Sequence, residues 1–290
     1  MRRRHIPAAA LAASLAAVAL AGCGSSSGAV VSVPTVAPAR VFALAGFQPV
    51  GSIKPGQPVT VSFTVKRPDG QALTQYRTGP GPHTGVHLII VRDDLAYIIH
   101  QHPPIGPNGL LRQTVSFPAP GPYRVLVDVY PDLPGVLPNF QLTQTVDVAG
   151  SYHPQPLPRF NAHFVVDGYH FDMAPHGSLH AIQAEFMHVD VTDPSGGKVT
   201  FTPWFGALAH AIFFQRGSLS YFHTHICAPN APNCGSLPGV RASAITGSSS
   251  APGKLTIGVL LPEPGTWRLF LQMKLAGRIV TAPFTLNVKP

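Results

Sequence analysis

Hydrophobic and polar residues alternate along short segments that end in turns rich in proline and glycine. Residues 59–65 alternate in this way and run into the turn Arg-Pro-Asp-Gly70. Residues 186–191 repeat the pattern and run into Thr-Asp-Pro-Ser-Gly196. A period of two residues is typical of strands that bury one face. The pattern therefore predicts an all-β protein built from short antiparallel strands.

The same order of segments occurs twice along the chain. An alternating strand is followed by a histidine-led apolar run, a His-x-His motif, a Pro-Gly turn with its strand, and a closing strand. The repeat predicts two tandem antiparallel β-sandwiches, immunoglobulin-like or cupredoxin-like, of about 110–125 residues each. The expected boundaries are 41–149 for the first domain, 150–165 for a Pro-rich linker and 166–290 for the second domain.

The amino terminus has the pattern of an export signal. Three arginines at residues 2–4 precede an apolar stretch over residues 8–21, and small residues then lead to Cys23. This arrangement resembles the bacterial lipobox, which implies a signal peptide over 1–22, lipid on Cys23 and a tether over 23–40. An ordinary signal peptide with an incidental cysteine is the alternative. We expect a lipid-anchored protein on the extracytoplasmic face of the cell membrane.

Two further cysteines, Cys227 and Cys234, bracket a short loop of Ala, Pro and Asn. Disulfides persist outside the cytosol, so we expect these two cysteines to form one. A metal site with two thiolates is the alternative.

Composition narrows the classes of protein that fit. Charged residues make up only 11% of the chain, and Glu185 and Glu263 are its two glutamates. Such a chain lacks the polar faces of a helical bundle, while 45% hydrophobic residues supply a core. Three arginines at residues 2–4 supply part of the net charge of +8, and the remaining basic residues are scattered singly, so we expect no nucleic-acid partner.

Histidines recur at matching spacings in the two halves. His100 and His102 follow His87 by 13 and 15 residues, and the second half repeats these spacings with His210, His223 and His225. If each pair of runs forms a hairpin with a two-residue turn, His87 lies opposite His100 and His210 lies opposite His223. Opposed side chains lie about 5 Å apart at Cβ, so three imidazoles would share one face in each half.

Three neutral imidazoles suit Cu(II) or Zn(II) and leave a position for water or a fourth ligand. His83 is a candidate fourth ligand in the first half only, because its counterpart in the second half is Gly206. Two other interpretations stay open: the rings stack as structural residues, or they form a metal-free pH sensor.

The segment over residues 87–103 has a histidine-led strand, a short acidic turn, Leu-x-Tyr and His-x-His-Pro. It resembles domains of actinobacterial secreted lipoproteins and is similar to the YtkA-like and CopC-like β-sandwiches associated with copper. The resemblance implies an immunoglobulin-like fold and a role with copper in the envelope. The second half departs from it, because Ile226 stands where Pro103 stands in the first.

The sequence favours a binding protein over an enzyme. It contains neither a nucleophile elbow nor a His-Glu-x-x-His motif, and the counterpart of Asp128 is Gln272. We expect a membrane-anchored protein that binds copper, ahead of zinc, through the histidine triplets. The competing hypothesis is a structural or interaction module of the envelope that meets a protein partner through an apolar patch at Trp204, Phe205 or Tyr130.

Overall fold

The computed structural model describes residues 41–290 apart from Pro80, Val136, 175–178, Asn230, 232–233, 235–245 and Ser250. The expected signal peptide over 1–22, the tether over 23–40 and the lipidation at Cys23 lie outside the described residues. Within the described part of the chain, no helix is long and apolar enough to cross a membrane.

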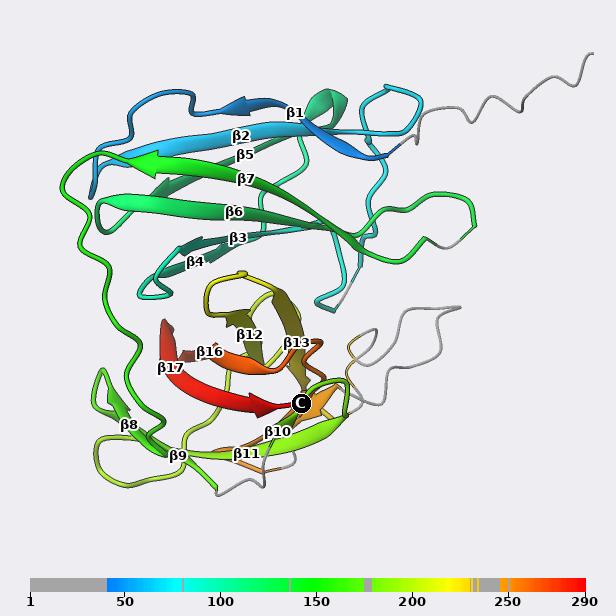
Figure 1. The fold of residues 1–290 in the computed structure, drawn as a ribbon. Helices are drawn as coiled ribbons and strands as arrows, with labels where there is room; N and C mark the ends of the chain where they lie inside the picture. The colour runs from blue at the N-terminus through cyan, green and yellow to red at the C-terminus, as the bar shows by residue number, and fades with distance from the viewer. Residues whose placement is uncertain are drawn as a thin grey trace, which may run out of the picture. The chain divides into compact units, whose positions relative to one another are not determined.

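Residues 43–148 form a β-sandwich of two antiparallel sheets, which we call the N-terminal half (Figure 1). Phe63 and Leu88, one from each sheet, lie in its core and are fully buried. One sheet has the order β1-β2-β5 and the other β4-β3-β6-β7. Its strands are β1 (Ala43–Gln48), β2 (Pro58–Lys66), β3 (Val86–Arg92), β4 (Ile98–Gln101), β5 (Leu110–Ser116), β6 (Gly121–Val129) and β7 (Phe140–Val148).

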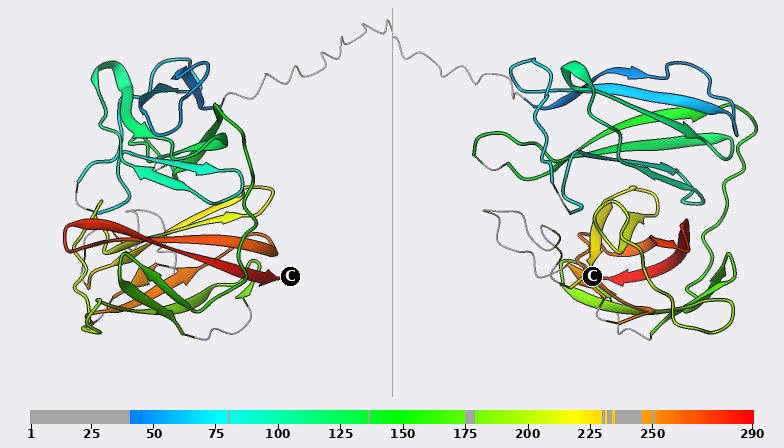
Figure 2. Two further views of the ribbon diagram at one scale, coloured as in Figure 1. Left: turned by 90° about the vertical axis from the view of Figure 1, so that its left-hand side faces the viewer. Right: turned by 180° about the vertical axis from the view of Figure 1, so that it is seen from behind.

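Residues 163–289, the C-terminal half, form a ten-stranded sheet with the order β10-β17-β16-β12-β13-β14-β15-β11-β9-β8 (Figures 1 and 2). The short strand β14 joins two layers, because residues of β9, β11 and β15 share one core with residues of β12, β16 and β17. Its strands are β8 (His163–Val166), β9 (Tyr169–Met173), β10 (Leu179–His180), β11 (Glu185–Thr192), β12 (Ala209–Gln215), β13 (Tyr221–Cys227), β14 (Gly247–Ser248), β15 (Lys254–Val259), β16 (Gly265–Leu275) and β17 (Arg278–Lys289).

The predicted all-β sandwich architecture is confirmed, and the halves correspond in strand register. His87 pairs with Asp128 between β3 and β6, and His210 pairs with Gln272 between β12 and β16. The order β4-β3-β6-β7 in one half matches β13-β12-β16-β17 in the other. The sequence repeat therefore reflects a structural repeat.

Strands β3 and β12 are buried along their whole length. Leu88 and Ile90 face the core of the N-terminal half, whereas Ile89 and Val91 point the other way and join a separate apolar cluster. That cluster is shared by both halves and contains Ile89, Val91, Leu95, Leu126, Ile212, Phe214, Leu219 and Phe270. The two halves thus pack together through equivalent strands, in the manner of an isologous interface.

The expected hairpin register is wrong by two residues. His100 lies opposite Ile89 and His223 lies opposite Ile212, while His210 faces His225. The turns are longer than expected, because the backbone bonds Arg92 N–Tyr97 O and Gln215 N–Ser220 O close four-residue loops. Each loop contains a leucine at positive φ. A slip of two residues keeps side chains on the same face, so the histidines still converge.

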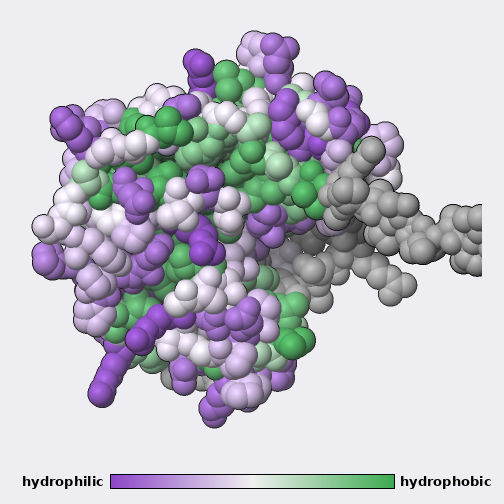
Figure 3. All heavy atoms as spheres, turned by 45° about the horizontal axis from the view of Figure 1, so that its top comes forward, coloured by the Kyte–Doolittle hydropathy of each residue, from purple (hydrophilic) through white to green (hydrophobic). Residues whose placement is uncertain are grey.

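The molecular surface mixes apolar and polar side chains, as the low charge of the chain predicts. On the face shown in Figure 3, hydrophobic residues gather between hydrophilic ones. Val41, just before the N-terminal half, and Val50, within it, are large apolar side chains that stay exposed.

Candidate metal centre

The six predicted histidine ligands form one cluster between the two halves instead of two separate sites. The centroid of the His87 ring lies 5.1 Å from that of His223, and the His100 ring lies 4.9 Å from that of His210. Both contacts join one half to the other. We call this group the histidine cluster; it consists of His87, His100, His102, His210, His223 and His225.

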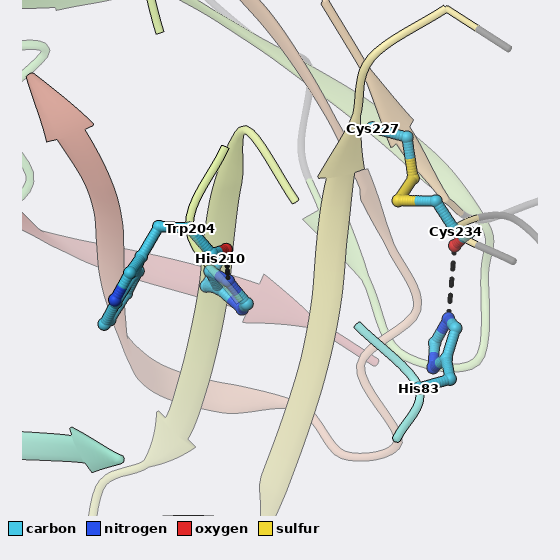
Figure 4. The surroundings of a disulfide bond; sticks show 5 residues. All are labelled: His83, Trp204, His210, Cys227 and Cys234. Carbon is cyan, nitrogen blue, oxygen red and sulfur yellow. Dashed lines mark hydrogen bonds between the residues drawn. A yellow bond between two sulfur atoms is a disulfide. The ribbon is translucent and has the colours of Figure 1, made fainter. Parts of the chain in front are cut away.

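Backbone carbonyls fix the tautomers of the first histidine in each half. His87 Nε2 lies 2.7 Å from Pro82 O, and His210 Nε2 lies 2.9 Å from Trp204 O (Figure 4). A carbonyl oxygen only accepts hydrogen bonds, so Nε2 carries the proton in both rings. The Nδ1 lone pair of each ring is therefore free to bind a ligand, as in histidines held by an outer hydrogen bond.

His223 lies between these two lone pairs. Its Nδ1 is 3.3 Å from His87 Nδ1, and its Nε2 is 3.4 Å from His210 Nδ1. A neutral imidazole has a single N–H and can donate to only one of the two. The other contact brings two lone pairs together, which is unfavourable in a buried site unless a cation lies between them.

His100 has a different partner, which comes from the other half. Its Nδ1 lies 3.2 Å from Gln272 Oε1. The amide nitrogen of Gln272 donates to Thr281 Oγ1 at 3.0 Å, which turns Oε1 toward the histidine. His100 therefore donates through Nδ1 and keeps its lone pair on Nε2.

Three buried imidazole nitrogens in the cluster have no hydrogen-bond partner among the described residues. They are Nε2 of His100, His102 and His225. A buried polar atom without a partner is costly, and such atoms in a native structure call for an unseen water, ligand or ion.

Burial keeps the cluster neutral. It lowers the pKa of His87 to about 3 and that of His210 to about 4; His210 adds to the effect on His87, and His83 adds to both. Burial also holds the pKa values of His100, His223 and His225 well below the usual range. Neutral imidazole is the form that binds transition metals.

Aromatic residues that could have formed an exposed patch cover the cluster instead. The Phe205 ring stacks on His102 at 3.8 Å, and the Trp204 ring lies 5.1 Å from that of His210. Tyr130 is buried, with its ring 4.9 Å from His87. These rings shield the site from water, while the side chains of His102 and His223 stay partly exposed at its edge.

Sequence reasoning missed the buried carboxylate beside the cluster. Asp128 accepts hydrogen bonds from Tyr130 of its own half and Tyr221 of the other, as well as from Asn139 and Gln141. Burial raises its pKa to about 6 despite these bonds. The signal was available, because the repeat places Asp128 and Gln272 on the strand beside the leading histidine of each half.

His83 lies at the edge of the cluster and links it to the disulfide loop. Cys227 and Cys234 form a disulfide with their Cα atoms 5.8 Å apart, and His83 Nε2 donates to Cys234 O at 3.1 Å (Figure 4). The His83 ring lies 4.8 Å from that of His225. His83 thus joins a loop of the N-terminal half to the end of β13.

A close approach of two loops explains why the counterpart of His83 is a glycine. A Cβ atom added to Gly206 would lie 2.3 Å from the backbone carbon of Gly81, and Gly206 has a φ of +80°. The loops that precede the leading histidines therefore meet backbone to backbone beside the site.

Two sets of three histidines could each hold one metal ion. The first contains His87, His100 and His223, and the second contains His210, His223 and His225. In each set one nitrogen per residue lies within 4.8 Å of the other two. The first set combines both halves, and His223 takes the place that the sequence pattern gave to His102.

The fold and site define a β-sandwich protein with a buried histidine cluster between its two halves. The chain belongs to a family described as a domain of unknown function, DUF8832, whose model matches residues 45–148 and 164–290. This match gives no support to the copper-associated families that residues 87–103 resemble. None of the curated proteins matches the chain.

The solved structures that match the chain are distant in sequence and align with low TM-scores. Fibronectin(III)-like modules of Clostridium thermocellum CbhA are 9% identical with a TM-score of 0.22, and the match covers 86% of this chain and 93% of that one. Invasin, a bacterial integrin-binding protein, is 16% identical with a TM-score of 0.24, and the match covers 86% of this chain. The chain spans 38% of the length of invasin.

Proposed function

We propose that this protein binds a transition metal, copper ahead of zinc, in the histidine cluster between its two halves. The observation that carries the proposal is the set of three buried Nε2 atoms, on His100, His102 and His225, that lack a partner. They occur beside two Nδ1 lone pairs whose direction is fixed by backbone carbonyls. A bound cation would satisfy several of these nitrogens together.

The spacing of the nitrogens also favours a metal. A tetrahedral ion with metal–nitrogen bonds of 2.0–2.1 Å keeps its ligand nitrogens roughly 3.3 Å apart. His87 Nδ1 and His223 Nδ1 are 3.3 Å apart, and His210 Nδ1 and His223 Nε2 are 3.4 Å apart. Two of the three nitrogens in each set therefore already have the spacing that an ion needs, and the third lies within 4.8 Å of both.

The donor atoms of the cluster determine which metals it would prefer. The cluster offers imidazole nitrogens, and Asp128, the buried carboxylate that the described residues place beside it, is already engaged by four hydrogen bonds. Mg²⁺ and Ca²⁺ prefer oxygen ligands, whereas copper and zinc accept imidazole. Among divalent ions copper binds such sites most tightly.

The cellular setting remains part of the proposal. Lipid on Cys23 would anchor the protein to the extracytoplasmic face of the membrane, and a tether over residues 24–40 would separate the sandwiches from the lipid. From there the protein would capture or buffer metal in the envelope, with an envelope protein as a further partner.

Metal titration of the full chain, purified in detergent without a histidine tag, tests the proposal. We expect Cu(II) and Zn(II) to bind with dissociation constants below micromolar. The double variant His223→Ala/His225→Ala should lose this binding. The control variant His170→Ala removes an exposed histidine of β9 and should bind as the wild type does.

A second double variant, His100→Ala/His102→Ala, separates one shared cluster from two independent sites. In a shared cluster, removing the histidines of one half also weakens metal binding by the histidines of the other half. The proposal would be overturned if the wild-type protein bound neither ion with a dissociation constant below micromolar. The stacked histidines would then be structural residues of the interface, as the competing hypothesis of a structural or interaction module holds.

A further inference from the structure

His223 is the histidine of the cluster whose two ring nitrogens both face the lone pair of another imidazole. Nδ1 faces His87 and Nε2 faces His210. We propose that His223 bridges two metal ions as an imidazolate, so that the cluster is a two-metal centre. This inference rests on the proposed function and adds to it the number of ions and the ligand that they share.

The two candidate sets assign the ligands. One ion takes His87 Nδ1, His223 Nδ1 and His100, whose free nitrogen is Nε2. The other ion takes His210 Nδ1, His223 Nε2 and His225, whose Nε2 is free. Each ion then has three nitrogen ligands and keeps an open coordination position.

The remaining hydrogen bonds explain why His223 is the bridge. His87 and His210 each donate one ring N–H to a backbone carbonyl, and His100 donates to Gln272, so each of these rings has one nitrogen left for a metal. Among the described residues, the ring nitrogens of His223 contact only histidines. His223 can therefore use both nitrogens.

The bridge also accounts for the proton that His223 loses. A neutral His223 gives up its N–H proton as the second metal–nitrogen bond forms, and the proton leaves to solvent across the partly exposed edge of this side chain. No oxidation or reduction occurs. The imidazolate supplies one negative charge between the two cations, and the Asp128 carboxylate lies on the strand beside His87.

Electron paramagnetic resonance during Cu(II) titration of the full chain tests this inference. Two Cu(II) ions across one imidazolate lie roughly 6 Å apart, given metal–nitrogen bonds near 2.0 Å. Antiferromagnetic coupling across the bridge should then remove most of the Cu(II) signal at two equivalents. Total copper is measured by atomic absorption, and a Cu(I)-specific chelator checks that the copper has stayed oxidised.

Variants separate the bridge from binding in general. His223→Ala should abolish the coupling and weaken both ions. His100→Ala should retain one uncoupled Cu(II), and His170→Ala, which removes an exposed histidine of β9, should retain the coupled pair. Tight binding of a single equivalent, or of two equivalents with the full Cu(II) signal, would overturn the bridge and leave the proposed metal binding intact. Wild-type protein without tight copper binding would overturn both.

Discussion

His100 and His223 occupy equivalent positions in the two halves, yet they have different surroundings. Nδ1 of His100 donates to Gln272 of the opposite half. Asp128, the counterpart of Gln272, instead binds Tyr130, Tyr221, Asn139 and Gln141. His223 is thereby left facing other histidines with both of its nitrogens.

An internal repeat can therefore supply matching ligands without giving them matching roles. The residue on the neighbouring strand decides which nitrogen of each imidazole is available. A single exchange, glutamine against aspartate, makes a nearly symmetric interface chemically asymmetric.

The largest loss of stability is expected when the metal-free protein is acidified. Burial lowers the pKa of all six histidines of the cluster, to about 4 for His210 and about 3 for His87. Below pH 6.5 the unfolded chain therefore binds protons that the folded protein does not, and stability falls as the pH falls toward 4.

Each titrating group contributes up to about 1.4 kcal/mol per pH unit, so the total loss reaches several kcal/mol. Urea unfolding of chelator-treated protein between pH 7 and pH 4.5 measures it. Copper should shift the loss to lower pH by binding the neutral rings. Constant stability across this range would show that the rings are not buried together.

Truncation of the apolar interface should affect both halves alike. Ile89 and Ile212 are equivalent, fully buried residues of the cluster shared by the halves. Replacement of either by alanine should cost about 2–5 kcal/mol because it leaves a cavity. Chemical denaturation measures the cost, and Ile279→Ala at an exposed position serves as the control. A loss confined to one variant would argue against packing through equivalent strands.

Gln272→Leu should weaken copper binding by about 10–100-fold, because removing the outer partner of a metal-binding histidine has effects of this size. The change also leaves Nδ1 of His100 without its acceptor. Competition titration with a copper chelator measures the change in affinity. Gln144→Leu, at an exposed position on β7, should have no effect. Unchanged copper affinity in Gln272→Leu would exclude His100 as a ligand.

Asp128→Asn should have the smallest effect on stability. At neutral pH it should change the free energy of unfolding by about 1 kcal/mol or less, because asparagine preserves the shape and most of the hydrogen bonds. Burial raises the pKa of Asp128 to about 6, so protonation of this group in the folded state adds stability as the pH falls from 6 to 4. Asparagine does not titrate, and the variant should unfold at a higher pH than the wild type. An unchanged acid midpoint would mean that Asp128 is solvated.

Much of the fold follows from the sequence because strand alternation and the tandem repeat are local signals. The six histidines of the cluster were also found from their spacing, and the two-residue error in register left them on the same face. The longer turns, with Leu95 and Leu219 at positive φ, gave no signal of this kind, because leucine rarely adopts that conformation.

The merging of two triplets into one cluster was not predicted, although part of its signal was present. The runs at residues 88–91 and 211–214, which follow the leading histidines, are continuously apolar, which is typical of strands covered on both faces. That pattern indicates an interface on the histidine face of each hairpin. The partner at that interface depends on contacts between residues more than a hundred positions apart, which local patterns do not specify.

Anomalous X-ray diffraction at the copper absorption edge, from crystals of the copper-loaded protein, would locate the bound copper. We expect anomalous density between the halves, within bonding distance of His223 and of Nδ1 of His87 or His210. Copper found only at exposed histidines such as His170, with the cluster unchanged, would contradict it.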